Sequence, residues 1–141
     1  MSFLEENERN AVRERLREMK YPVKLVHFTQ ELNLEYGREA RMLLEDLAEI
    51  SPKLSVEIHN FLLEKENAAE CGVDKVPATL ICNGKDYGIR YYGLPAGYEF
   101  AALLDAILSV SGADSELSLE TRRKLTQIIQ PVHLEVFVTP T

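Results

Sequence analysis

The sequence predicts an α/β fold with a mixed β-sheet, and three observations lead to this prediction. Apolar residues at helical spacing alternate along the chain with short stretches rich in β-branched and aromatic residues. Proline follows three of the helix-like stretches, at Pro22, Pro52 and Pro131. The pair Asn83-Gly84 separates two β-rich stretches, which is a strong signal for a hairpin of antiparallel strands. Helices that alternate with strands, closed by one hairpin, predict helices packed on a sheet with both parallel and antiparallel neighbours.

Four elements are predicted in the first half of the chain, in alternation: a helix over residues 3–20, a strand over 23–28, a helix over 34–50 and a strand over 54–58. Ser2 and Glu5 have capping-box spacing at the start of the first helix. The 34–50 helix has its apolar residues on one face, and 54–58 alternates with period two, as a strand with one exposed face does.

Six elements follow in the second half: a weaker helix over 62–71, strands over 78–82 and 87–92, a helix around 100–108, a helix around 119–129, and a strand over 132–138. We expect Asn83 and Gly84 to adopt the positive φ values of a type I′ turn. The resulting order is a helix, then β-α-β-α-β-β-α, then a helix and a strand. Two β-α-β crossovers closed by the hairpin and a last helix would give the mixed sheet.

The end of the chain repeats part of its beginning. Five residues recur at one constant spacing: Leu16, Pro22, Val23, Leu25 and Phe28 match Leu125, Pro131, Val132, Leu134 and Phe137. Both copies have a helix-like stretch followed by a strand-like one, which favours a tandem duplication. We therefore divide the chain into a complete unit, residues 1–112, and the first helix and strand of an incomplete second unit, residues 113–141.

The composition argues against several classes of function. The formal net charge is −7, and basic residues are scattered among acidic ones, which disfavours binding to nucleic acids and anionic membranes. The one basic cluster, Arg122-Arg123-Lys124, is interpreted as a solvated helix face. The N-terminus lacks a basic region followed by an apolar core, and no apolar run approaches the roughly 20 residues that span a bilayer. We expect a cytoplasmic location.

The cysteines and histidines do not form a recognisable site. Cys71 and Cys82 lack the spacing of a redox pair, and an extended strand from Pro77 would separate them too far for a disulfide. Cys82 closes the apolar run that begins at Ala78, so it is interpreted as a small buried hydrophobe. The three histidines are scattered in strand-like surroundings: His27, His59 and His133. We therefore expect no metal site and no cofactor.

Several segments resemble one family in particular. They are Val76-Pro77-Ala78-Thr79-Leu80-Ile81, the hairpin 83–86, residues 88–100 and the closing Val136-Phe137-Val138-Thr139-Pro140-Thr141. Together they resemble the first unit of the glutaredoxin-like protein disulfide oxidoreductases, which carry two thioredoxin units in one chain. The resemblance covers residues 23–141 and implies a thioredoxin-like fold. The chain is similar also to the N-terminal portion of the alkyl hydroperoxide reductase flavoprotein subunit, whose first unit lacks a redox cysteine pair.

The resemblance identifies two candidate site positions. In the oxidoreductases a Cys-x-x-Cys pair begins the helix after the first strand, where the helix N-terminus stabilises a thiolate. Here the corresponding residues run from Leu34 to Gly37, so this is a vestigial redox position and we expect no catalytic residue. The resemblance also implies that the Val76-Pro77 peptide bond is cis. The backbone at Val76 and Pro77 is then a candidate substrate-binding edge for an extended peptide, the alternative being that it is only an inherited determinant of the fold.

Three functions remain open. The first is a redox-inactive unit of a two-unit thiol-disulfide oxidoreductase involved in cell redox homeostasis, whose catalytic pair lies beyond Thr141. The second is a complete interaction module that docks extended peptides, and the third is a docking domain for a flavin-dependent peroxide-reducing system. The expected partners are thiol or disulfide proteins or extended peptides. A second copy is also expected, because an uncovered strand pairs readily with another chain and would give a homodimer through residues 115–141.

The residue after Thr141 carries an expectation of its own. In the resembling family Thr-Pro-Thr leads directly into the first cysteine of the second unit's redox pair. We expect a selenocysteine there, encoded by a UGA codon read as a stop, because a selenol is more acidic than a thiol and is more fully ionised at neutral pH. Sequencing the gene beyond the codon for Thr141 tests this expectation.

Overall fold

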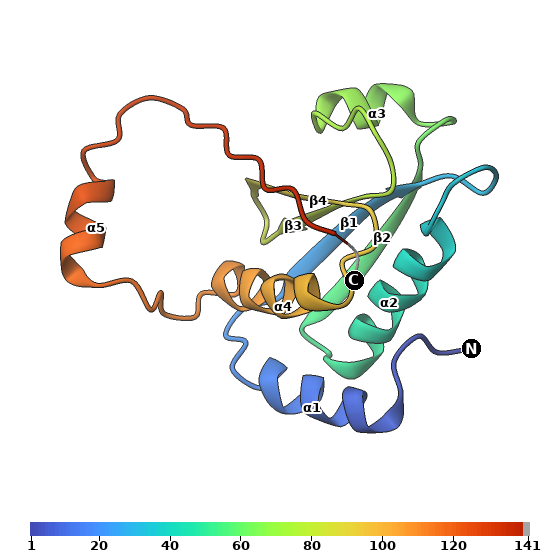
Figure 1. Cartoon of the computed structure of the whole chain (residues 1–141), viewed down its shortest axis with the longest axis horizontal. Helices are drawn as coiled ribbons and strands as arrows, with labels where there is room; N and C mark the ends of the chain where they lie inside the picture. The colour runs from blue at the N-terminus through green and yellow to red at the C-terminus, as the bar shows by residue number, and fades with distance from the viewer. Residues whose placement is uncertain (140–141) are drawn as a thin grey trace.

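The computed structural model describes residues 1–139. Its helices are α1 (Glu6–Leu16), α2 (Gly37–Ile50), α3 (Lys65–Glu70), α4 (Tyr98–Val110) and α5 (Leu119–Leu125), and its strands are β1 (Val23–Thr29), β2 (Leu54–Asn60), β3 (Ala78–Cys82) and β4 (Asp86–Tyr92). This order confirms the predicted α/β architecture with an extra helix at each end (Figure 1). No helix in the described part of the chain is long and apolar enough to cross a membrane.

The four strands form one mixed sheet in the order β2-β1-β3-β4. β1 is parallel to β2 and antiparallel to β3, and β3 is antiparallel to β4. The predicted hairpin and the mixed sheet are therefore confirmed. The predicted second crossover is wrong, because β3 returns antiparallel to its neighbour β1; among these four strands, only the β1-α2-β2 connection joins parallel neighbours.

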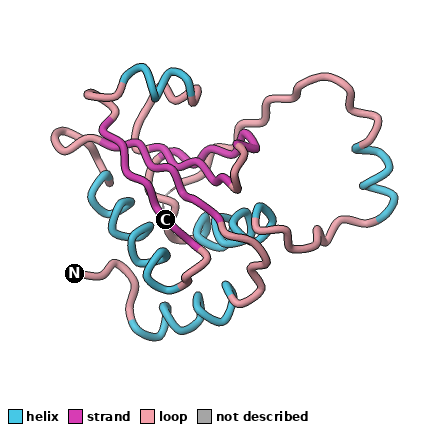
Figure 2. Tube along the Cα trace, turned by 180° about the vertical axis from the view of Figure 1, so that it is seen from behind, coloured by secondary structure: helices cyan, strands magenta, loops and turns pink. Residues whose placement is uncertain are grey.

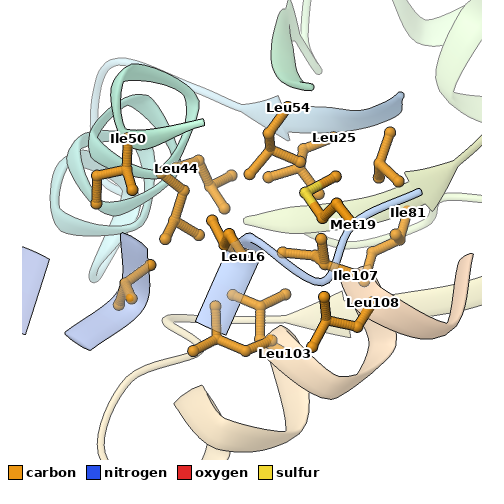
Figure 3. Packing of buried hydrophobic residues seen from close by; sticks show 14 of the residues in the cluster. Leu16, Met19, Leu25, Leu44, Ile50, Leu54, Ile81, Leu103, Ile107 and Leu108 are labelled. Atoms are coloured by element: carbon orange, nitrogen blue, oxygen red, sulfur yellow. The ribbon is translucent and has the colours of Figure 1, made fainter. Parts of the chain in front are cut away.

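Helices α1, α2 and α4 cover one face of the sheet and enclose the main core (Figure 3). The apolar stripes of the three helices meet residues that alternate along β1, as period-two side chains must. The residues shown there include Leu16, Met19, Leu25, Leu44, Ile50, Leu54, Ile81, Leu103, Ile107 and Leu108. The short helix α3 covers the opposite face, where a smaller cluster contains Phe28, Ala68, Val73, Ala78 and Leu80.

The N-terminal helix begins later than predicted, and Ser2 has a different role. The Glu5 N–H donates to the Glu8 carboxylate at 2.8 Å, so the capping interaction lies three residues further along. The Ser2 hydroxyl instead donates to Asp46 Oδ2 of α2 at 2.9 Å. The backbone N–H groups of Phe3 and Leu4 donate to the same oxygen at 2.7 and 2.8 Å. The buried Asp46 carboxylate thus holds in place the residues that lead into α1.

The hairpin between β3 and β4 is not a type I′ turn. Gly84 has a φ of 62°, but Asn83 is not among the residues with positive φ. The loop holds three residues between Cys82 and Asp86, and the strand register shifts beside it. The Asn83 side-chain amide donates to the Val110 carbonyl at 3.0 Å, which ties the hairpin to the end of α4.

The predicted C-terminal strand over 132–138 is wrong for the isolated chain. Helix α5 is present but ends at Leu125, and residues 131–139 contain no strand. Helix α5 stands away from the sheet in both views (Figures 1 and 2), and the chain after it makes a wide arc before its dark red end crosses in front of β3 and β4 in Figure 1. A strand needs a neighbour to satisfy its backbone groups, and no strand of residues 1–139 pairs with this segment. Pro140 and Thr141, which close the resembling segment, lie outside the described residues.

Candidate functional site

One end of the sheet gathers both candidate positions. β1, β2 and β4 run in the same direction, so they finish at the same end, and β3 begins there. The loop 30–36 leaves this end from β1, and Pro77 comes immediately before β3. Phe28 pairs with Ala78, so Thr29 at the end of β1 and Pro77 before β3 both belong to this end. We call this the site end of the sheet.

Apolar packing fills the candidate position at Leu34 and Gly37. Gly37 is buried and is the first residue of α2, and the Leu34 side chain lies directly over it. A Cβ built on Gly37 would lie 2.6 Å from Leu34 Cδ2 and 3.0 Å from Leu34 Cγ. The leucine therefore fills the space that a side chain at position 37 requires. Neither residue carries a nucleophile, and the two depend on each other sterically.

The loop before α2 adopts an unusual backbone. Asn33 and Tyr36 have φ values of 55° and 61°, in the left-handed region. This region costs a non-glycine residue roughly 1–2 kcal/mol, and tyrosine is rarely found there. Tyr36 precedes the first residue of α2 and is 40% exposed. The loop thus displays an aromatic ring at the site end.

The Val76-Pro77 peptide bond is cis, which confirms the expectation from the resemblance. The Pro77 carbonyl accepts a hydrogen bond from the Gly93 N–H at 2.9 Å, which fixes the segment against the end of β4. Val76 is partly buried against the smaller cluster that contains Phe28. The structure therefore places Val76 and Pro77 at the same end of the sheet as the loop that contains Leu34.

Several exposed apolar side chains belong to segments at the same end of the sheet, and no periodic pattern in the sequence indicated them. Leu32 is 77% exposed in the loop after β1, and Leu62 and Leu63 are 55% and 83% exposed in the loop after β2. Tyr98, at the start of α4, is 89% exposed. The Asn60 Oδ1 accepts hydrogen bonds from the N–H groups of both Leu62 and Leu63, at 3.0 and 3.1 Å. The two leucines are therefore held outward by an ordered turn.

His27 lies in the core near this end, and the sequence patterns did not identify it as a site residue. It is fully buried on β1, its Nδ1 lies 3.0 Å from the Thr79 hydroxyl, and its Nε2 has no hydrogen-bond partner among residues 1–139. Burial, reinforced by the positive charge of Arg41, lowers the pKa of His27 to about 4, against smaller opposing effects of the Ala78 backbone and Glu45. The imidazole is neutral at pH 7.

His59 on β2 is held between two carboxylates, Glu57 of the same strand and Glu64 just before α3. Its Nδ1 lies 2.8 Å from Glu64 Oε1, its Nε2 lies 2.6 Å from Glu57 Oε1, and its ring stacks on Phe28 with centroids 5.1 Å apart. Partial burial lowers its pKa, but the hydrogen bonds and charges of Glu64 and Glu57 outweigh burial and raise the pKa overall. The hydrogen bonds of His59 join it to carboxylates and to an amide rather than to a hydroxyl or thiol nucleophile, so we interpret the arrangement as structural support for β2.

Cys71 and Cys82 are both free thiols, as predicted, and both are partly buried against the smaller cluster. Burial is the main cause that raises the pKa of Cys82, with Asp86 adding to it, so this thiol is a weak nucleophile at neutral pH. Cys82 is less buried than predicted, because it lies at the end of β3 beside the hairpin loop. Within residues 1–139 no group of three or more His, Cys, Asp or Glu side chains is arranged to hold a metal ion.

The contact between Leu34 and Gly37 predicts a strong coupling between substitutions. In the wild-type background we expect Gly37→Ala to lower the free energy of unfolding by about 1 kcal/mol, because the new methyl group meets the leucine. In a Leu34→Ala background the same change should raise it by about 0.5 kcal/mol, since alanine favours a helix over glycine. Urea unfolding of the four proteins measures the cycle. Equal effects of Gly37→Ala in both backgrounds would contradict the packing described here.

Several known proteins share this fold and part of this sequence, although no known protein-family profile matches the chain. The AhpF subunit of alkyl hydroperoxide reductase from Xanthomonas campestris pv. phaseoli is 35% identical over 99 residues, which cover 70% of this chain and 16% of that protein. The solved NTD_N/C domain of alkyl hydroperoxide reductase AhpF from Enterococcus faecalis matches 86% of this chain and 59% of its own, at 21% identity and a TM-score of 0.78. A protein disulfide oxidoreductase from Aeropyrum pernix K1 matches 89% of this chain and 55% of its own, at 27% identity and a TM-score of 0.76.

The chain thus has a thioredoxin-like fold, and solved thioredoxins match it as well. Its homologues are the N-terminal region of alkyl hydroperoxide reductase AhpF and a protein disulfide oxidoreductase. The chain spans 16% of the Xanthomonas relative and little more than half of the oxidoreductase chain.

Proposed function

We propose that this chain is a redox-inactive thioredoxin-like unit of a two-unit thiol-disulfide oxidoreductase that acts in cell redox homeostasis. It would supply a scaffold and a docking surface, and the thiol chemistry would belong to a second unit. A cytoplasmic location remains a prediction that accompanies this function.

The packing of Leu34 on Gly37 carries this proposal. A working redox position needs a thiolate at the helix N-terminus and a second thiol to resolve the mixed disulfide. Here a leucine side chain occupies that space, 2.6 Å from where a side chain on the glycine would begin. The remaining thiols, Cys71 and Cys82, belong to the opposite face of the sheet, where α3 packs.

The relatives support the two-unit part of the proposal. The chain matches 59% of the Enterococcus faecalis domain and 55% of the Aeropyrum pernix oxidoreductase, so each of those chains has room for further structure. The repeat of residues 16–28 in residues 125–137 supports the same conclusion, because it is the pattern that a duplicated unit leaves.

Insulin reduction by dithiothreitol tests the proposal. We expect the 141-residue chain to give no turnover above a protein-free control, because no paired thiol lies at the N-terminus of α2. Cys71→Ala and Cys82→Ala variants serve as controls and should behave as the wild type does. Turnover that is clear in the wild type and lost in either cysteine variant would refute redox inactivity.

A second candidate function is peptide docking at the site end. The exposed side chains of Leu32, Leu62 and Leu63 favour it, because ordered apolar groups around an extended edge at Val76 are what an apolar peptide needs. Carboxymethylated insulin B chain, which cannot be reduced further, is a suitable probe. Binding that Leu63→Ser weakens and Leu119→Ser leaves unchanged would support docking, and no measurable binding would contradict it.

A third candidate is a docking domain within a flavin-dependent peroxide-reducing system. The 35% identity to the Xanthomonas AhpF subunit favours it. A peroxiredoxin or flavoprotein gene beside that of this chain would support this candidate over the oxidoreductase.

A further inference from the structure

The two carboxylates beside His59 match a charged imidazole and not a neutral one. His59 Nδ1 lies 2.8 Å from Glu64 Oε1, and Nε2 lies 2.6 Å from Glu57 Oε1. An ionised carboxylate only accepts hydrogen bonds, so both contacts are favourable only when both ring nitrogens carry a proton. A neutral ring has one N–H and places the lone pair of its other nitrogen against a carboxylate oxygen. One of the two contacts must therefore be lost when the ring loses its proton.

Asn67 on α3 offers the ring a different partner at Nδ1. Its Nδ2 lies 3.2 Å from His59 Nδ1, and its Oδ1 accepts from the Cys71 thiol at 3.8 Å, in agreement with this orientation of the amide. An amide N–H donates to Nδ1 only after that nitrogen has lost its proton. We therefore expect neutral His59 to exchange Glu64 for Asn67 at Nδ1.

The other side of the ring has no such alternative. Lys24 of β1 pairs with Glu57 Oε2 at 3.0 Å and is the main cause that lowers the pKa of Glu57, ahead of His59. Glu57 therefore stays charged and continues to accept from the Nε2–H. On β1, Phe28 stacks on the ring and brings no charge. Among the described residues, the charged groups hydrogen-bonded to the ring are thus Glu57 and Glu64.

Glu64 connects the ring to the turn 60–64. Its Oε2 accepts from the Asn60 N–H at 2.8 Å, and its own N–H donates to the Asn60 carbonyl at 2.9 Å. The Asn60 Oδ1 accepts from the N–H groups of Leu62 and Leu63. The hydrogen bond from the imidazole is the main cause that lowers the pKa of Glu64, ahead of the Asn60 N–H. The charged ring thus holds the carboxylate that supports this turn.

We propose that the charge on His59 sets the order of the turn 60–64, and with it the position of the two exposed leucines of this turn at the site end. When the ring is charged, Glu64 bridges it to the turn. When the ring is neutral, Asn67 replaces Glu64 and the turn loosens. Partial burial lowers the pKa of His59, but the two carboxylates outweigh burial and raise it above 6.5. The ordered turn therefore prevails at pH 6.5 and is lost as the pH rises through the raised pKa.

Nuclear magnetic resonance of the 141-residue chain tests this switch without a peptide. Imidazole nitrogen shifts give the pKa and the tautomer of His59, and backbone Cα order parameters of Leu62 and Leu63 report on the turn. We expect a pKa above 6.5, an Nε2–H tautomer above it, and order parameters that fall from about 0.85 to below about 0.6 as the ring loses its proton. A pKa at or below 6.5, an Nδ1–H tautomer, or order parameters that stay constant across the titration overturns the inference.

Glu64→Gln should reverse the response. Its single side-chain oxygen can accept from the Asn60 N–H, which turns its NH2 group toward His59 Nδ1 as a donor. That donor suits the neutral ring, so we expect the pKa of His59 to fall and the turn to stay ordered above it. Glu66→Gln changes an exposed carboxylate two residues further on and should behave as the wild type does. A wild-type pKa and wild-type loosening in Glu64→Gln contradict the switch.

Binding of carboxymethylated insulin B chain at pH 6 and pH 9 tests the consequence for function. This consequence rests on the second candidate function, because peptide docking at the site end would use the leucines of this turn. We expect binding about tenfold weaker at pH 9, as when one molecule in ten keeps the turn ordered, and a smaller loss in Glu64→Gln. Equal losses in the two proteins overturn the link between His59 and docking. Absence of binding at both pH values contradicts docking itself, and the order parameters then decide the switch alone.

Discussion

Replacing Asp46 by asparagine is expected to lower the free energy of unfolding by about 3 kcal/mol. Asp46 is on α2, its side chain is 5% exposed, and its Oδ1 pairs with Arg9 at 3.1 Å. Its Oδ2 accepts three hydrogen bonds from the N-terminal segment, from the Ser2 hydroxyl and the backbone N–H groups of Phe3 and Leu4. An amide has one oxygen, so it cannot accept at both positions, and one set of buried donors would lose its partner.

The neighbouring Glu49 provides a matched control. It pairs with the same arginine, Arg9, at 3.1 Å, but its side chain is 69% exposed. Glu49→Gln should therefore cost less than about 1 kcal/mol. Urea unfolding measures both variants, and amide exchange should show faster opening of α1 in Asp46→Asn alone. Equal small losses in the two variants would contradict the anchoring role of Asp46.

Acidification from pH 6.5 to 4 is expected to remove about 3 kcal/mol of stability through His27 alone. The pKa of His27 is lowered to about 4 in the folded chain, against an ordinary value of 6.5, and burial is the main cause. Between these two pH values the unfolded chain binds a proton that the folded chain excludes. Protonation therefore favours unfolding as the pH falls, and the contribution is fully present above pH 6.5.

The difference between wild type and His27→Leu isolates this effect, because His59 and the carboxyl groups titrate in both proteins. We expect the wild type to lose stability relative to the variant as the pH falls from 6.5 to 4. His133→Gln changes a histidine that is 83% exposed at its side chain, and it should leave the wild-type curve unchanged. Parallel curves for wild type and His27→Leu would show that His27 is not kept neutral by burial.

Local sequence patterns predicted most of the fold because helices and strands each have a characteristic spacing of apolar residues. The apolar stripe of α2 and the proline after α1 identified those helices, and Asn83-Gly84 located the hairpin. The turn type was wrong because the loop has three residues and Asn83 does not adopt a positive φ; its side chain instead binds the end of α4, a contact between distant segments. The predicted strand over 132–138 was wrong because a β-rich sequence forms a strand only where a neighbouring strand is available to pair with it.

The candidate site was predictable in position but not in its packing. The resemblance located Leu34, Gly37 and the cis bond before Pro77, and the structure brings them to one end of the sheet. Nothing in the sequence indicated that Leu34 lies over Gly37, because no periodic pattern describes the path of the loop before α2, in which Tyr36 has a left-handed backbone. The buried imidazole of His27 was equally hidden, since a histidine in a strand-like stretch can point to either face.

Restoring a cysteine pair tests most directly whether the fold preserves a redox position that has lost its chemistry. The variant is Leu34→Cys/Gly37→Cys in a background with Cys71→Ala and Cys82→Ala; removing Leu34 frees the space that a side chain at position 37 needs. A control pair, Leu32→Cys/Glu35→Cys, has the same spacing but lies before α2. We predict that the 34/37 dithiol reduces insulin disulfides, is itself oxidised to an intrachain disulfide and is returned to the dithiol by dithiothreitol, while the wild type and the control pair do not catalyse this reduction. An active wild type, or a 34/37 pair no faster than the control pair, would show that this end of the sheet is not a vestigial redox position.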